Sequence, residues 1–211
     1  MRNILKTALL GGALLLPAAS LQAAIVAGEV TGGDSGGSFV QLDPAPGTNI
    51  GNNNNNSPNL FALDEMQNVT LASAVAGIAA GTVVDSHYVF FDPVNSPASS
   101  VIGNVTFDGP ILALITGTSA LAGSDGIFGN ANVNYLNPNN RGLEGPDTAS
   151  FMGNQVFVNF VATSPGDYIR VLTASAVPEP GTWAMMLLGF FGLGAALRQK
   201  PAKARSRVNY A

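Results

Sequence analysis

Short runs of β-branched and aromatic residues, each closed by a Gly, Pro or Asn turn, constrain the fold of this chain more than any other feature. The clearest runs are residues 83–91, which end at Asp92-Pro93, and residues 155–161. Residues 101–108 alternate between apolar and polar side chains, as a half-buried strand does. Because such runs recur about every ten residues with almost no helical period, the sequence predicts an all-β fold, an antiparallel β-sandwich or jelly roll.

Turn residues suggest how these strands connect. Residues 101–115 turn at Asp108-Gly109-Pro110, and residues 155–172 turn at 164–167. Both segments are therefore expected to form β-hairpins. Thr118 is expected to cap one short helix.

Charge divides the chain into three parts. Between residues 25 and 177 there are only two basic residues, Arg141 and Arg170, against twelve acids, a formal charge of −10. The other basic residues lie near the two ends of the chain. An acidic middle of this kind repels phosphates, so nucleic acid is not an expected partner.

The N-terminus has the order of a secretory signal peptide. Arg2 and Lys6 precede an apolar run from Thr7 to Leu16, and small residues follow Pro17. This order predicts removal of roughly residues 1–24 by signal peptidase during export. The absence of cysteine is compatible with export, because a domain large enough to bury a core does not need disulfides.

The C-terminus combines a proline motif, an apolar segment and a basic tail. Residues 181–197 are seventeen uncharged residues, which as a helix rise about 25 Å, close to the lower limit for crossing a bilayer. Trp183 stands at the outer edge of this predicted transmembrane helix. Basic residues follow it, as the positive-inside rule expects on the cytoplasmic side: Arg198, Lys200, Lys203, Arg205 and Arg207.

This segment resembles the PEP-CTERM sorting signal of Gram-negative bacteria, which the membrane protein exosortase reads. The matching residues are Pro178-Glu179-Pro180, the start at Trp183, the glycine-broken helix and the basic end. The resemblance implies an exported protein that passes through the inner membrane, is cut near the Pro-Glu-Pro motif and reaches the cell surface or the extracellular polymer. The two prolines agree with this reading, since they disfavour helix around Glu179 and keep it accessible.

Four domains follow from these features. Residues 1–24 are the signal peptide and residues 178–211 the sorting signal. Residues 25–59, rich in Gly and Asn, are expected to be disordered or loosely ordered. Residues 60–177 are expected to form the β-sandwich ectodomain.

A protease-like loop and a zinc site are two functional hypotheses that the sequence does not support. Gly33-Asp34-Ser35-Gly36-Gly37 matches the nucleophile loop of chymotrypsin-like proteases, yet the only histidine, His87, follows it in a different order, and a glycine-rich linker is the simpler interpretation. A triad depends on geometry rather than order. With one histidine and no cysteine, a zinc site would need at least two carboxylate ligands.

Calcium is the better metal hypothesis, because it takes oxygen ligands. The candidate ligands are Asp92, Asp125, Glu144 and Asp147, all expected in loops. Solvated turn residues explain the same acids without a metal, and Arg141 is an alternative partner for Glu144. Arg170 is expected to pair with an acid on a neighbouring strand.

The sequence therefore favours a non-enzymatic surface or extracellular-matrix protein without a required cofactor. The resemblance implies an association with exopolysaccharide or biofilm. The alternative is a calcium-dependent carbohydrate-binding module or a secreted hydrolase on the same β scaffold. Few Tyr and no Trp between residues 25 and 177 weaken sugar stacking and a glycosidase groove.

Overall fold

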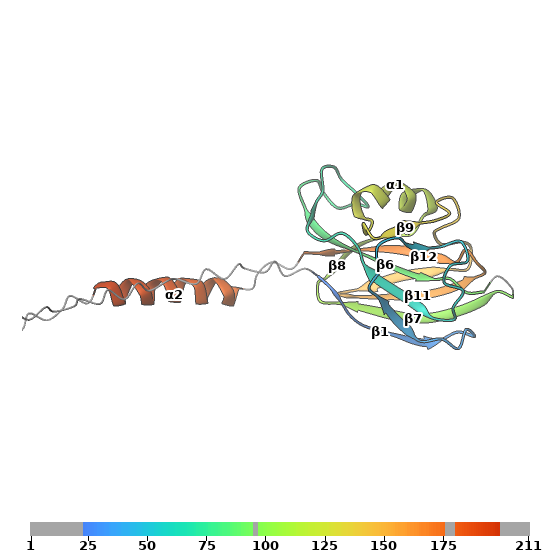
Figure 1. Cartoon of the computed structure of the whole chain (residues 1–211), viewed down its shortest axis with the longest axis horizontal. Helices are drawn as coiled ribbons and strands as arrows, with labels where there is room; N and C mark the ends of the chain where they lie inside the picture. Colours follow the sequence, from blue (N-terminus) through green and yellow to red (C-terminus); the bar gives the residue numbers. More distant parts are fainter. Residues whose placement is uncertain (1–22, 95–96, 176–179, 199–211) are drawn as a thin grey trace, which may run out of the picture.

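The computed structural model describes residues 23–94, 97–175 and 180–198 (Figure 1). Twelve strands and two helices lie in these ranges, so the all-β prediction is confirmed. The elements are β1 (Ile25–Gly32), β2 (Phe39–Leu42), β3 (Thr48–Ile50), β4 (Leu60–Asp64), β5 (Val69–Thr70), β6 (Val83–Phe91), β7 (Ser99–Phe107), β8 (Ile111–Ile115), α1 (Thr118–Phe128), β9 (Val133–Tyr135), β10 (Thr148–Met152), β11 (Gln155–Ala162), β12 (Asp167–Ala174) and α2 (Pro180–Arg198).

Two sheets face each other. Sheet A has the order β1-β7-β11-β10 and is antiparallel throughout. Sheet B has the order β2-β4-β6-β12-β8, with the short β5 also paired to β6. In sheet B only the β2–β4 pair is parallel. The two sheets form a β-sandwich.

The core of the sandwich comes from the alternate residues that each sheet turns inward. β7 and β11 contribute Val101, Val105, Phe107 and Phe160, while β6 and β12 contribute Phe91 and other apolar side chains from sheet B. On β11 the burial alternates strictly, because one face of sheet A meets the core and the other meets solvent. β11 therefore turns Val156, Val158 and Phe160 into the core.

Sheet B is covered on both faces. Its outer face packs against α1 and the small parallel β3–β9 sheet, which Figure 1 shows on the side of sheet B away from β1 and β7. A second apolar cluster fills this layer and includes Tyr88, Phe90, Tyr168 and Phe128. Nearly every residue of β6 and β12 is buried, as expected for strands that are covered on both faces.

The two predicted hairpins are wrong. β7 lies in sheet A and β8 in sheet B, and β11 and β12 are divided in the same way. The turns at 108–110 and 164–167 therefore carry the chain from one sheet to the other. β11 exposes one face whereas β12 is buried on both, and strands with such different surroundings belong in different layers. The hairpin in this region joins β10 to β11 through Gly153-Asn154.

Residues 25–59 are also more ordered than expected. β1 is an edge strand of sheet A, β2 an edge strand of sheet B, and β3 belongs to the outer layer. Even the Asn-rich loop makes specific bonds, because the Asn54 and Asn56 side chains donate to backbone carbonyls three residues earlier. Asparagine tolerates the left-handed backbone of Asn52, Asn53 and Asn56 and can cap its own turns, so the composition indicates tight turns here rather than disorder.

The structure differs from the predictions at both ends of the chain. Residues 1–22 lie outside the described part, but Ala23 is buried and its backbone N–H donates to Asp85 at 2.6 Å. The domain therefore begins at or before Ala23, not at residue 25. At the other end α2 confirms the predicted helix; among the described residues, however, no helix is both long and apolar enough to cross a membrane.

Candidate functional site

The sorting segment is described in part. Pro180 begins α2, Trp183 lies within its first turn, and Arg198 ends it with an exposed side chain. The rest of the predicted motif, Pro178, Glu179, Lys200, Lys203, Arg205 and Arg207, lies outside the described residues. Proline at the start of a helix is well placed, because its missing N–H would have had no partner there.

The middle of α2 exposes a set of large apolar side chains. Figure 1 draws the helix apart from the sandwich, and the exposed residues are Met186, Leu187, Leu188, Phe190, Phe191 and Leu193. A helix that is apolar around its circumference is normally buried in a protein or in lipid. α2 therefore needs an apolar environment that the domain itself does not supply.

Asp125, one of the four calcium candidates, is already neutralised by arginine. Its Oδ2 lies 2.5 Å from the Arg141 guanidinium, and its Oδ1 accepts from Arg170 at 3.1 Å. The alternative pairing of Arg141 with Glu144 is therefore wrong. α1 carries Asp125 over the outer face of sheet B, and this position brings the acid to both arginines. Asp125 is not available to a metal.

Arg170 anchors a buried ion-pair network on the same face. Its Nε and one terminal nitrogen donate to the two Glu65 oxygens at 2.6 and 2.7 Å, and both side chains are fully buried. Ser86 and Tyr135 hydroxyls also donate to Glu65, each at 2.6 Å. Glu65 follows β4, and β6 lies between β4 and β12 in the sheet. The prediction that the partner of Arg170 lies on an adjacent strand is therefore wrong.

The pKa values of Arg170 and Tyr88 are both shifted upward in this network. Burial alone would lower the pKa of Arg170, but the Glu65 carboxylate outweighs it and the pKa is raised. Burial raises the pKa of Tyr88, whose hydroxyl accepts from Arg141 at 3.2 Å. Both shifts favour a charged Arg170 and a neutral Tyr88, and we assign the network a structural role.

His87 is sealed in the sandwich interior. Its Nδ1 lies 2.6 Å from Asp64, and Nε2 lies 3.0 Å from the Thr173 hydroxyl. Because a carboxylate only accepts, Nδ1 carries the proton. This Asp–His–hydroxyl order is that of a nucleophile relay, but Thr173 is fully buried and the Phe107 ring packs on His87 at 4.5 Å between centroids. No substrate can reach the hydroxyl.

Ser35 has no such relay around it. It lies in the turn after β1, where the Asp34 carboxylate accepts from the Ser100 backbone and hydroxyl. These bonds, with the backbone bond largest, lower the pKa of Asp34. His87 instead contacts Asp64 and Thr173. The segment that resembles a protease loop is a fixed turn on the edge of sheet A.

Asp92, the second calcium candidate, immediately follows β6 and is fully buried. One oxygen, Oδ2, accepts from the Asn55 N–H at 3.2 Å. Burial raises its pKa. Its other oxygen has no hydrogen-bond partner within the described structure, nor have the side-chain oxygens of Asn55 and Ser164. The Asn-rich loop thus covers a carboxylate whose hydrogen bonding is incomplete.

Glu144 and Asp147 are the two candidates that the structure brings together. Asp147 accepts from the Glu144 N–H at 3.0 Å and from the Val161 N–H at 2.8 Å. Beside them lies Asp167, which the sequence analysis treated only as a turn residue. Burial, then the charges of Asp147 and Glu144, raise the pKa of Asp167 to about 8. A buried acid at the start of a strand carries no sequence signal, because turns commonly contain Asp.

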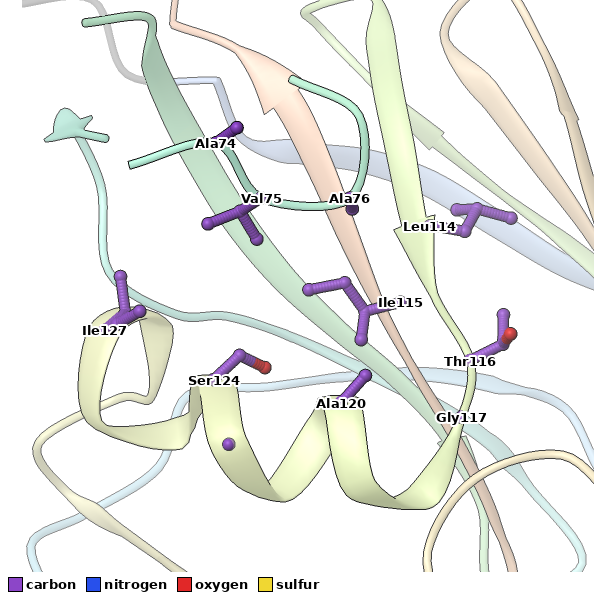
Figure 2. A pocket seen from close by; sticks show the side chains of 11 residues that line it. Ala74, Val75, Ala76, Leu114, Ile115, Thr116, Gly117, Ala120, Ser124 and Ile127 are labelled. Carbon is purple, nitrogen blue, oxygen red and sulfur yellow. The ribbon is translucent and has the colours of Figure 1, made fainter. Parts of the chain in front are cut away.

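Two cavities in the described part of the chain differ in their lining. An apolar one of about 550 Å³ lies between α1, the end of β8 and the loop after β5 (Figure 2). Its lining contains no carboxylate or imidazole, so it offers space for an apolar group but no acid–base chemistry. A polar cavity of about 370 Å³ includes Asn140, Glu144 and Asp167 in its wall. Across the described ranges, no three His, Cys, Asp or Glu side chains are grouped to hold a metal.

Comparison with known proteins identifies the C-terminal segment. A family model described as the PEP-CTERM protein-sorting motif matches residues 176–200. No curated protein and no solved structure matches the chain. The match begins just after β12 and includes all of α2, and it implies export toward the cell surface with exosortase as the processing partner. The C-terminal segment of this chain is a PEP-CTERM protein-sorting motif.

Proposed function

We propose that this chain is a non-enzymatic surface or extracellular-matrix protein, exported through an N-terminal signal peptide and cut by exosortase near Pro178-Glu179-Pro180. The observation that carries the proposal is the sorting motif at residues 176–200, which directly follows a complete β-sandwich. The sandwich is then the part that persists at the destination. Its association is with exopolysaccharide or biofilm, as for other substrates of exosortase.

An intermediate at the inner membrane is part of this proposal. The exposed apolar side chains of α2 support it, since lipid offers the environment that they lack in water. The basic residues that follow Leu197 in the sequence are attracted to the cytoplasmic side. Cleavage at the proline motif would separate α2 from the domain and release the domain.

The N-terminal cleavage site follows from the packing of Ala23. Because Ala23 is buried and bonded to the buried Asp85, we place signal-peptide cleavage at or before this residue. Cleavage after Ala23 would leave one Asp85 oxygen without its partner. Such a loss costs about 1–3 kcal/mol.

The proposal of a non-enzymatic role is supported by the arrangement of the reactive side chains. His87 has both ring nitrogens bonded inside the core, and the arginines bind Glu65 and Asp125. These groups act as structure rather than as acid, base or nucleophile.

The alternative, a calcium-dependent carbohydrate-binding module, is favoured by the open face of sheet A. Phe157, Ile102 and Val161 are exposed there beside the amides of Gln155 and Asn159. An aromatic ring among amide side chains is a chemistry that binds sugars. A purified chain that binds immobilised exopolysaccharide, and loses that binding in Phe157→Ala, would support this function. A secreted hydrolase on the same scaffold is tested by polysaccharide-degradation assays.

The experiment for the leading proposal is replacement of Pro178, Glu179 and Pro180 by alanine in a host with active exosortase. We expect the variant to accumulate uncut in the inner-membrane fraction, whereas the parent chain reaches the surface. The matched control replaces Pro138 and Asn139, which are exposed in a turn of the domain, and leaves delivery unchanged. Normal processing and delivery of the triple variant would refute the assigned role of the motif.

A further inference from the structure

An acidic cavity lies where β12 begins, at one end of the sandwich. Asp167 is the first residue of β12 and only 3% exposed, yet it lines the cavity of about 370 Å³. Asn140 and Glu144 line it from the loop before β10, and Thr163 lines it from the link between β11 and β12. Two separate stretches of chain thus bring oxygen-bearing side chains to one cavity.

The Asp167 carboxylate is not satisfied by the protein. Its Oδ2 is buried and has no hydrogen-bond partner in the part of the chain that the structure describes. A buried carboxylate oxygen without a donor costs several kcal/mol unless a proton or a cation neutralises it. The unpaired atom therefore needs a proton or a cation as its partner.

Like charges surround this carboxylate. Glu144 lines the same cavity, and the Asp147 carboxylate accepts from the Glu144 N–H. The two arginines of the domain are bound elsewhere, to Asp125 and Glu65. The cavity therefore concentrates negative charge with no basic side chain of the domain to balance it.

We propose that this cavity binds a calcium ion, with Asp167 and Glu144 as carboxylate ligands and Asn140 and Thr163 supplying neutral oxygens. Calcium takes six to eight oxygen ligands in flexible geometry and accepts carboxylates, amides, carbonyls and water together. Zinc instead takes nitrogen and sulfur in a tetrahedral set. Two carboxylates with neutral oxygens agree with the finding that no group of three acidic, His or Cys ligands lies in the described residues.

Asp147 acts as a positioning residue. Each of its oxygens accepts a backbone N–H, from Glu144 and from Val161. These bonds tie the loop that carries Glu144 to β11, which forms another wall of the cavity. Asp147 thereby fixes the distance between the two carboxylate ligands.

The test is calcium titration of the purified full chain in detergent after EDTA treatment, followed by calorimetry. We expect one calcium per chain with a dissociation constant of roughly 10⁻⁴ to 10⁻³ M, the range of extracellular calcium modules. Asp167→Asn and Glu144→Gln should each weaken binding at least about tenfold. Glu144 is exposed, so its variant tests the site even if Asp167→Asn impairs folding.

The matched control is Asp43→Asn, which removes one exposed charge outside the cavity and should leave the affinity unchanged. Absence of calcium binding at about 10 mM, an order of magnitude above the expected range, would overturn the proposal. Binding unchanged by either ligand substitution would overturn it as well. In those cases Asp167 is neutralised by a proton that it shares with Asp147.

Discussion

The buried ion pair between Arg170 and Glu65 gives the sharpest prediction for stability. Glu65→Gln keeps the size of the side chain but removes its charge and replaces one acceptor oxygen by an NH₂ donor. Four donors now converge on the carboxylate: two from Arg170 and one each from Ser86 and Tyr135. In the variant an NH₂ group faces some of these donors, and the Arg170 charge keeps only the more distant Asp125.

The magnitude follows from the burial of both partners. Removing one member of a fully buried pair costs about 3–5 kcal/mol, because the remaining charge is left uncompensated. A domain of this size has a free energy of unfolding of about 5–15 kcal/mol. Glu65→Gln is therefore expected to remove a large fraction of the total stability.

Urea unfolding of the full chain in detergent, followed by far-UV circular dichroism, measures this difference. Glu29→Gln is the matched control, because Glu29 is exposed, and surface changes of this kind stay within about 0.5 kcal/mol. The double variant Glu65→Leu with Arg170→Met should be more stable than Glu65→Gln, since it removes both charges. If Glu65→Gln lowers the free energy of unfolding by less than about 1 kcal/mol, the pair does not contribute the expected value of about 3–5 kcal/mol for a fully buried ion pair. That result would refute its assigned role in stabilising the fold.

Two further predictions concern the apo protein and its glycines. The pKa of Asp167 is about 8 in the folded state and about 4 in the unfolded state. Between these pH values the folded state therefore keeps a proton that the unfolded state loses, so stability falls as the pH rises. Without calcium, the wild type should lose about 1.4 kcal/mol of stability per pH unit between about pH 4 and 8, relative to Asp167→Asn. Asp147 and Glu144 are the charges that face this group, and parallel pH profiles of wild type and variant in urea unfolding would contradict the assignment. Gly37→Ala should destabilise the chain by about 1–3 kcal/mol, because a Cβ there would clash with the backbone carbonyl oxygen of Pro58. Gly126→Ala, in open space on α1, should stabilise it by about 1 kcal/mol; equal melting temperatures for the two glycine variants would count against this packing.

The sequence predicted local structure well because local structure depends on local patterns. The runs at 83–91 and 155–161 are strands within a residue of their predicted bounds. Hairpin pairing failed at 108–110 and 164–167, because the choice of sheet depends on which faces are buried by elements far away in the chain. α1 and β9 cover sheet B, and no local signal in β12 reports that cover.

The ion-pair partners of the acidic side chains could not be predicted from the local sequence either. Two arginines among twelve acids made pairing certain, but Glu65 lies 105 residues from Arg170 and stands after a strand that is not its neighbour. Asp125 reaches Arg141 only because α1 folds over sheet B. The burial of Asp167 was not predicted, because an aspartate in an exposed turn and a buried aspartate cannot be told apart from the local sequence.

The sorting segment shows the opposite case. Its motif is contiguous, so the sequence alone predicts a PEP-CTERM sorting signal at residues 178–211, and the family model matches residues 176–200. Its function depends on order along the chain rather than on tertiary contacts. The domain in front of it requires the folded structure before any of its acids can be assigned.

The mass of the mature protein isolated from the cell surface tests the central claim most directly, because it reports both cleavages at once. The account predicts a chain that begins at or before Ala23, ends near Pro178-Glu179-Pro180 and lacks α2. A surface protein whose mass still includes α2 and the basic tail would contradict processing at the sorting motif.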